Sequence, residues 1–197
     1  MHLRTFPPAV LAAVLSACAT EPVLLNSERI EHRFGSYGIE VLASEAGLRR
    51  SSLYSLDGDI PTCRTYAVVR FVDQLDDHYR EEHTKVLAGN SIGAIFRSHG
   101  WDVHKQTIYI GNLALRPGST SIGDLMHISG PRELAMHVYQ LLLVRNEQSF
   151  EYATIVEIHH PDYLSENDLQ QLYKYEPTTA PSTQIISDLV TLVLRDQ

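Results

Sequence analysis

The chain has 197 residues, of which 24 are acidic and 16 are Lys or Arg, so its formal net charge is −8 at pH 7. An acidic surface repels phosphate backbones, and this composition therefore argues against a nucleic-acid partner. The length fits one domain with a hydrophobic core of ordinary size and is small for two.

The first 17 residues have the layout of a secretory signal. Arg4 provides a positive charge near the start, no acidic residue precedes Cys18, and residues 9–15 are all apolar. This run is too short to span a bilayer as a helix, which requires about 20 apolar residues. We therefore expect residues 1–17 to be removed from the mature protein.

Leu15, Ser16, Ala17 and Cys18 follow one another at the end of this apolar run. They resemble the lipobox of bacterial lipoproteins that signal peptidase II processes. The resemblance implies that Cys18 becomes the first mature residue and carries a diacylglycerol on its sulfur and a third acyl group on its amine. Three acyl chains would make release from the membrane negligible, because one chain alone gives only marginal binding. The alternatives are an ordinary signal cleaved after Ala17, with Cys18 incidental, or a cytosolic protein with an apolar start.

The residue after Cys18 bears on the location that the resemblance implies. In lipoproteins of enteric bacteria, Asp at this position retains the protein at the inner membrane, whereas this chain has Ala19. The resemblance therefore predicts an outer-membrane lipoprotein that faces the periplasm. Loss of Arg4 with the signal takes the net charge from −8 to −9. Residues 18–27 are expected to form a short lipidated tether.

Residues 28–176 are predicted to form one α+β domain. Segments rich in β-favouring residues alternate with turn residues, which is typical of an antiparallel sheet. We expect about six strands, within residues 39–72, 101–115, 134–145 and 149–159. The pattern of residues 77–99 predicts one principal helix that packs across this sheet.

Two further helices are expected near the C-terminus. Ser165 and Asp168 have the spacing of a capping box, which predicts that residues 165–173 form a short helix. Residues 177–197 are predicted to be a linker followed by a last helix, whose apolar face docks on the domain or recruits a partner. This face contains Ile186, Leu189, Val190 and Val193.

Two residues are candidate nucleophiles. Cys63 has only Arg64 as an obvious activator, so we expect a buried structural thiol, and without a second free cysteine no intramolecular disulfide can form. Ser91 occupies the serine position of a G-x-S-x-G pattern at residues 89–93. A nucleophile elbow requires a strand before this turn, whereas the preceding charged residues have a helical pattern. We favour close packing of small residues and keep Ser91 as a remote catalytic candidate.

Residues 134–145 and 149–159 are predicted to form a hairpin with a three-residue loop. The register that best separates its two faces pairs His137 with Glu157 and places His159 and Tyr139 on the same face. The opposite face is then the expected core face. It contains Met136, Val138, Leu142, Val144, Phe150, Tyr152, Val156 and Ile158.

His137, Glu157 and His159 are candidate metal ligands. Two imidazoles and a carboxylate on one rigid surface are competent to hold a metal ion or to perform acid–base chemistry. The alternative is a cross-strand pair of His137 and Glu157 that stabilises the sheet by up to about 1 kcal/mol.

These observations lead to two functional hypotheses. The first is a non-catalytic outer-membrane lipoprotein, without a cofactor, that binds an envelope protein or a cell-wall component through a sheet face or the last helix. The second is a small periplasmic enzyme, such as a metal-assisted hydrolase that uses His137, Glu157 and His159. A concave pocket at these side chains would favour the enzyme, and a convex exposed surface would exclude it.

Overall fold

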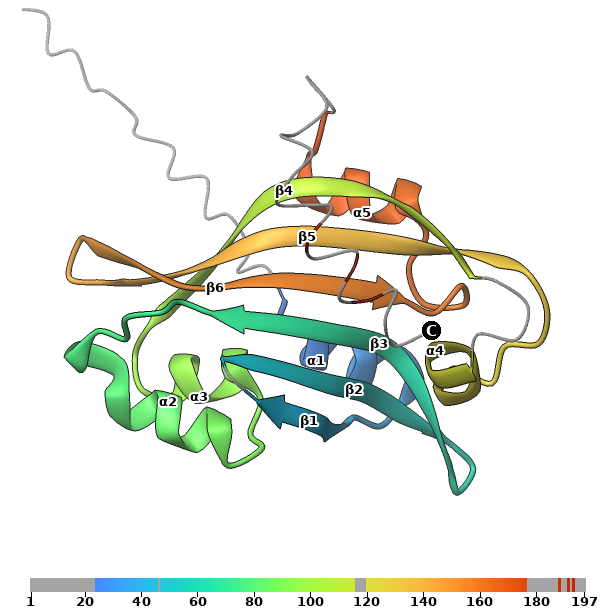
Figure 1. Ribbon diagram of the computed structural model, residues 1–197, viewed down its shortest axis with the longest axis horizontal. Helices are drawn as coiled ribbons and strands as arrows, with labels where there is room; N and C mark the ends of the chain where they lie inside the picture. The colour runs from blue at the N-terminus through green and yellow to red at the C-terminus, as the bar shows by residue number, and fades with distance from the viewer. Residues whose placement is uncertain are drawn as a thin grey trace, which may run out of the picture.

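The computed structural model describes residues 24–45, 47–115 and 120–176, together with Asp188, Thr191 and Val193. Six antiparallel strands form one sheet in the order β1-β2-β3-β6-β5-β4, as Figure 1 shows. The strands are β1 (Gly38–Glu45), β2 (Leu48–Asp57), β3 (Ile60–Phe71), β4 (Asp102–Leu115), β5 (Arg132–Arg145) and β6 (Gln148–His159). The described helices are α1 (Asn26–Phe34), α2 (Arg80–Leu87), α3 (Ile92–Ser98), α4 (Thr120–Leu125) and α5 (Glu166–Tyr173), with a 3-10 helix η1 (Asp77–Tyr79) before α2. The prediction of a single α+β domain with about six antiparallel strands is confirmed.

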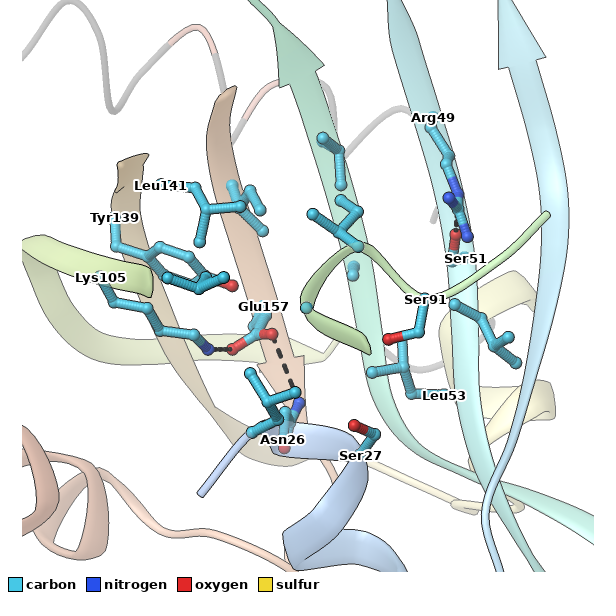
Figure 2. A pocket seen from close by; sticks show the side chains of 18 residues that line it. Asn26, Ser27, Arg49, Ser51, Leu53, Ser91, Lys105, Tyr139, Leu141 and Glu157 are labelled. Carbon is cyan, nitrogen blue, oxygen red and sulfur yellow. Dashed lines mark hydrogen bonds and ion pairs between the residues drawn. The ribbon is translucent and has the colours of Figure 1, made fainter. Parts of the chain in front are cut away.

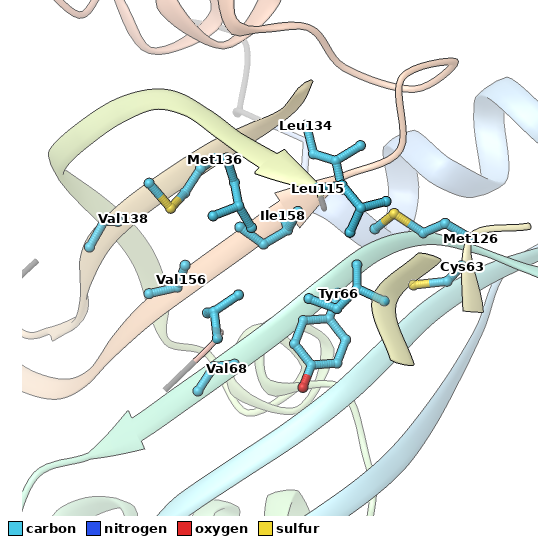
Figure 3. Close-up of a cluster of buried hydrophobic side chains, with 13 residues drawn as sticks. Cys63, Tyr66, Val68, Leu115, Met126, Leu134, Met136, Val138, Val156 and Ile158 are labelled. Carbon is cyan, nitrogen blue, oxygen red and sulfur yellow. The ribbon is translucent and has the colours of Figure 1, made fainter. Parts of the chain in front are cut away.

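The central strands are buried on both faces of the sheet. On one face, Val138, Val156 and Ile158 belong to an apolar cluster that also includes residues of α4 (Figure 3). On the other face, Tyr152 of β6 and Phe96 of α3 belong to a second cluster rich in aromatic rings. As a result, β3 is buried at every position from residue 62 to residue 69. Each face of the sheet therefore supports part of the hydrophobic core.

The hairpin of β5 and β6 has the predicted pairing of His137 with Glu157, but its loop is shorter than predicted and one strand contains a β-bulge. Its loop has two residues, Asn146 and Glu147, whose φ angles of 51° and 64° are typical of a type I′ turn. The strands leave this loop one residue out of the predicted register, and a β-bulge next to Leu141 corrects the offset. Beyond the bulge, His137 pairs with Glu157 as predicted.

The bulge also divides the predicted core face. Near the loop the prediction is wrong, because Phe150 and Tyr152 pack with Leu143 rather than with Leu142 and Val144. Beyond the bulge the prediction is confirmed, since the four remaining residues of that face share one cluster.

The predicted principal helix at residues 77–99 is divided into η1, α2 and α3. Gly89 has a φ of 104°, a left-handed conformation that glycine adopts readily and that does not continue an α-helix. The side-chain amide of Asn90 donates to the carbonyl of Lys85 at 2.9 Å and helps to end α2. The break allows both Tyr79 and Phe96 to enter the aromatic cluster.

The ends of the chain differ in part from the expectation. Helix α1 begins at Asn26, which lies inside the predicted tether, and α4 was not predicted. Residues 1–23, with the predicted signal and Cys18, lie outside the described residues, as do Ile186, Leu189 and Val190. Val193 is fully buried in the cluster of Figure 3, as expected if the last segment docks on the domain. Every helix in the described part of the chain is too short or too polar to cross a bilayer.

Candidate functional site

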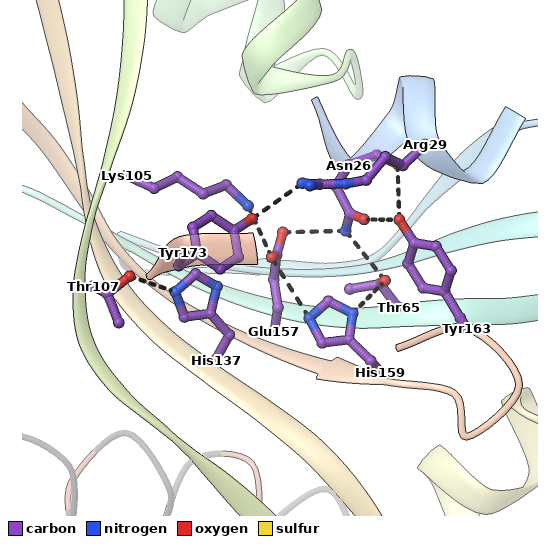
Figure 4. A network of polar contacts seen from close by, with 10 residues as sticks. All are labelled: Asn26, Arg29, Thr65, Lys105, Thr107, His137, Glu157, His159, Tyr163 and Tyr173. Carbon is purple, nitrogen blue, oxygen red and sulfur yellow. Dashed lines mark hydrogen bonds and ion pairs between the residues drawn. The ribbon is translucent and has the colours of Figure 1, made fainter. Parts of the chain in front are cut away.

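The hairpin residues singled out in the sequence lie on the face of the sheet that α1 and α5 cover (Figure 4). His137 and Glu157 are paired across the strands, and His159 follows on β6. All three are buried, with 0%, 5% and 1% of their surfaces exposed. The predicted proximity is confirmed, but the three residues belong to the protein interior rather than to an exposed surface.

Glu157 is held by a buried ion pair. Its Oε2 accepts a hydrogen bond from Nζ of Lys105 at 3.0 Å, and its Oε1 accepts one from Nδ2 of Asn26 at 3.3 Å. Burial alone would raise the pKa of Glu157, but the Lys105 ammonium lowers this pKa to about 2. Burial alone would lower the pKa of Lys105, but the Glu157 carboxylate raises it well above its ordinary value. Both groups are therefore charged at neutral pH.

The two histidines beside this pair are neutral. Nδ1 of His159 lies 3.0 Å from the hydroxyl of Thr65, and Nε2 of His137 lies 3.0 Å from the hydroxyl of Thr107. Burial lowers the pKa of His159 to about 4 and the pKa of His137 to about 2. The second ring nitrogen of each histidine has no hydrogen-bond partner within the described ranges.

Neutral imidazole nitrogens are metal ligands, so this arrangement bears on the metal hypothesis. Nε2 of His159 lies 3.9 Å from Oε2 of Glu157, which exceeds hydrogen-bond distance. Among the residues that the structure describes, no group of three or more His, Cys, Asp or Glu is arranged to hold a metal. The Lys105 ammonium already supplies the positive charge beside the carboxylate.

A cavity of about 80 Å³ lies next to this network, between the sheet and the first turns of α1 and α3 (Figure 2). The Lys105–Glu157 pair lies on one side of the cavity, and Arg49 of β2 lies on the other. His137 and His159 are not among its lining residues. Between the charged groups the walls are apolar and include Leu25, Leu53, Val69, Val103, Leu141 and Ile155.

Arg49 is a buried cation, with 1% of its surface exposed. Its Nε donates to Oγ of Ser51 at 2.9 Å, and its Nη1 donates to the backbone carbonyls of Val86 and Asn90 at 2.8 and 2.9 Å. Its Nη2 has no hydrogen-bond partner in the described structure. Burial lowers the pKa of Arg49, and no described carboxylate opposes this effect. The carbonyls near the end of α2 carry only partial negative charge, so they hold the guanidinium without neutralising it.

The surroundings of Ser91 and Cys63, the two candidate nucleophiles, indicate a structural role for both residues. Ser91 is the N-cap of α3 and follows α2 rather than a strand, so the turn of a nucleophile elbow is not formed. Close packing explains Gly93, because a Cβ there would lie 2.7 Å from the side chain of Leu25. Cys63 is buried, which raises the pKa of its thiol to about 11, as expected for a structural thiol.

Sequence reasoning missed Asn26, Arg49 and Lys105. Arg49 precedes Ser51 and Leu53 at alternate positions of β2, and Lys105 follows Val103 in the same way on β4. Side chains at alternate positions share a face, so this pattern could have identified two cations on a covered face. No local signal distinguishes Asn26 from the rest of the predicted tether.

We predict that Glu157→Gln destabilises the protein by about 3–5 kcal/mol, because it leaves the Lys105 ammonium buried without its carboxylate. Chemical denaturation of the purified chain measures this change. Glu151→Gln on the same strand is the matched control, since Glu151 is exposed. It should change the free energy of unfolding by less than about 0.5 kcal/mol. Equal effects of the two substitutions would contradict the importance of the pair.

We also predict that stability falls as the pH decreases from about 6.5 to about 4. The unfolded chain protonates His159 near pH 6.5, whereas the folded protein keeps it neutral down to about pH 4, so protons favour unfolding in this interval. Urea denaturation at several pH values measures the slope. His159→Asn should reduce the slope, whereas His104→Asn, at an exposed position of β4, should not. An unchanged slope in His159→Asn would refute this assignment.

Comparison with known proteins adds little to this geometry. No protein-family model matches the chain, and no curated protein matches it. Among solved structures, a transcriptional regulator of the GntR family from Enterococcus faecalis V583 aligns with a TM-score of 0.34 and 12% sequence identity. The alignment covers 66% of this chain and 93% of that chain. A likeness of this size is too small to assign a family or a function.

Proposed function

We propose that the chain is a lipid-anchored protein of the bacterial outer membrane, facing the periplasm, whose domain binds a small organic anion without transforming it. The observation that carries the binding function is Arg49, a buried guanidinium that lines an apolar cavity and has no carboxylate partner in the described ranges. The anchor is supported by the resemblance of residues 15–18 to a lipobox.

The surroundings of Arg49 favour an anion. Removing a charge from water is unfavourable unless an opposite charge or sufficient hydrogen bonds replace the water. Two carbonyls and one hydroxyl meet part of this requirement and leave Nη2 unpartnered. A carboxylate or phosphate that accepts a hydrogen bond from Nη2 would supply the missing charge. Lys105 attracts an anion less strongly, because Glu157 neutralises it.

The size and lining of the cavity limit the ligand. Its volume of about 80 Å³ is about half of the 150 Å³ that holds a benzene molecule in an engineered apolar cavity. Aliphatic walls and this volume favour a ligand with a short apolar body attached to its acid group. An envelope protein or a cell-wall component, the partners expected from the sequence, would fit this site only through a small acidic end group.

The alternative function is metal-assisted hydrolysis at His137, Glu157 and His159. It has less support, because both oxygens of Glu157 are engaged by Lys105 and Asn26, and neither imidazole lines the cavity. Elemental analysis distinguishes the two functions. A stoichiometric metal that is lost when His137 and His159 are changed to Ala would favour the enzyme.

We predict that acetate and propionate bind at least tenfold more tightly than acetamide and propionamide, because only the acids bring a charge to Arg49. Ligand-observed NMR with the full chain in lipid nanodiscs measures the affinities. A rise in melting temperature with ligand concentration provides an independent check. Arg49→Gln should abolish the preference for the acids, and Arg49→Lys should retain part of it.

Arg50→Gln is the matched control for this experiment. Arg50 follows Arg49 on β2, so its side chain leaves the opposite face of the sheet, and its replacement should preserve the preference for acids. Failure of both acids to bind would contradict the binding function. Equal binding of acids and amides would contradict both the role of Arg49 and the proposal that the ligand is an anion.

We predict that Cys18→Ser removes the acyl chains and the outer-membrane location of the protein, because Cys18 is the proposed point of attachment. Membrane fractionation and mass spectrometry of the mature N-terminus measure both effects. Cys63→Ser is the control and should keep the lipids and the location. A wild-type protein that begins with unmodified Cys18 would disprove the anchor.

A further inference from the structure

The first turn of α1 forms part of the cavity wall. Leu25, Asn26 and Ser27 line the cavity, and Figure 2 shows Asn26 and Ser27 at the start of this helix. A movement of this turn would therefore change the access to the cavity.

Helix α1 has little apolar contact with the rest of the domain. Of its nine residues, only Asn26 and Ile30 are buried. A helix of this length is not stable alone in water, and segments with few buried apolar contacts open at the lowest free energy.

The two ends of α1 are attached in different ways. At the C-terminal end, Phe34 packs against the ring of Tyr163, and the Arg64 guanidinium lies 4.0 Å from the centre of the Phe34 ring. Gly35 follows with a φ of 76°, a left-handed conformation that glycine adopts readily. This end therefore provides both an anchor and a hinge.

At the N-terminal end, the attachment is polar (Figure 4). Glu28 accepts a hydrogen bond from Nη1 of Arg97 of α3 at 3.0 Å, and Nη2 of Arg29 donates to the hydroxyl of Tyr173 at 3.1 Å. The contacts of the first turn with the sheet come from Asn26. Its Nδ2 donates to Oγ1 of Thr65 at 3.1 Å and to Oε1 of Glu157 at 3.3 Å. Its Oδ1 accepts a hydrogen bond from the hydroxyl of Tyr163 at 2.5 Å. Water can replace each of these contacts when the turn moves away, so their release does not leave unpaired polar groups in a dry interior.

Leu25 closes the remaining space between α1 and α3. A Cβ added at Gly93 of α3 would lie 2.7 Å from Cδ2 of Leu25. The leucine side chain thus occupies the room that the missing Cβ leaves free. A larger residue at position 93 would displace the side chain of Leu25 from this space.

We propose that α1 is a lid that swings its N-terminal end away from the sheet about Gly35, with Asn26 as the latch. When the lid is closed, it covers the cavity and the Lys105–Glu157 pair; when it is open, both are accessible to solvent. The identity of the ligand rests on the proposed function, whereas the opening is a property of the chain alone. In the lipidated protein the moving end is also the end that continues into the tether.

Hydrogen exchange of the full chain in lipid nanodiscs, measured by mass spectrometry, tests the lid. In the wild-type protein, the amides of α1 should exchange at least tenfold faster than the amides of β6. Asn26→Ala should increase the exchange of α1 at least tenfold further and leave β6 unchanged. Ser27→Ala, at the neighbouring cavity residue, is the matched control and should change neither. Exchange of α1 at the rate of β6 in both wild type and Asn26→Ala would overturn the proposal.

A second pair of variants acts from α3. Gly93→Ala should also accelerate the exchange of α1, because its Cβ displaces Leu25. Adding Leu25→Ala to Gly93→Ala removes the obstructing side chain and should return the exchange toward the rate of Leu25→Ala alone. Equal exchange in Gly93→Ala and wild type would count against the role of Leu25 as the closing contact.

Propionate separates the lid from the binding function. If the lid closes over bound propionate, saturating propionate should slow the exchange of α1 at least tenfold. Independent opening of α1 together with no binding of propionate would support the lid and contradict the proposed ligand class. Binding of propionate while α1 exchanges only with the sheet would support the ligand class and contradict the lid.

Discussion

The ion pair of Lys105 and Glu157 joins parts of the domain that lie far apart in the sequence. Lys105 belongs to the edge strand β4, Glu157 belongs to the central strand β6, and Asn26 of α1 binds the same carboxylate. A buried charge requires its partner, because either group alone would remain in the interior without a counter-charge. The seating of α1 and the polar side of the cavity depend on this contact, whereas burial keeps the nearby histidines neutral.

The charge at the cavity is opposite to the charge of the whole protein. The described lining residues include two cations, Arg49 and Lys105, and one carboxylate, Glu157. Because Lys105 and Glu157 compensate each other, one positive charge remains on a chain whose net charge is −8. The local field of a buried site acts over a few ångströms and is weakly screened, so it can select an anion despite an acidic surface. The net charge of the chain therefore does not determine the charge of a buried site.

Local sequence patterns predicted the sheet and the pairing of His137 with Glu157, but they did not predict the loop length or the β-bulge that together produce this pairing. The alternation of apolar and polar residues selected the register, while the predicted loop was one residue too long and the bulge that compensates for it went unseen. Local patterns do not show which helix will cover a strand face. Asn26 binds Glu157 across 131 positions, and Arg49 binds carbonyls 37 and 41 positions away. These contacts exist only once the fold is complete, so the candidate site could not be read from neighbouring residues.

The buried thiol of Cys63 affects how such a chain matures. With a pKa of about 11, roughly one molecule in ten thousand carries a thiolate at pH 7. The thiolate is the species that attacks disulfides, and the side chain is out of reach of other proteins in the folded state. Secretion into an oxidising compartment would therefore not trap the folded chain in mixed disulfides.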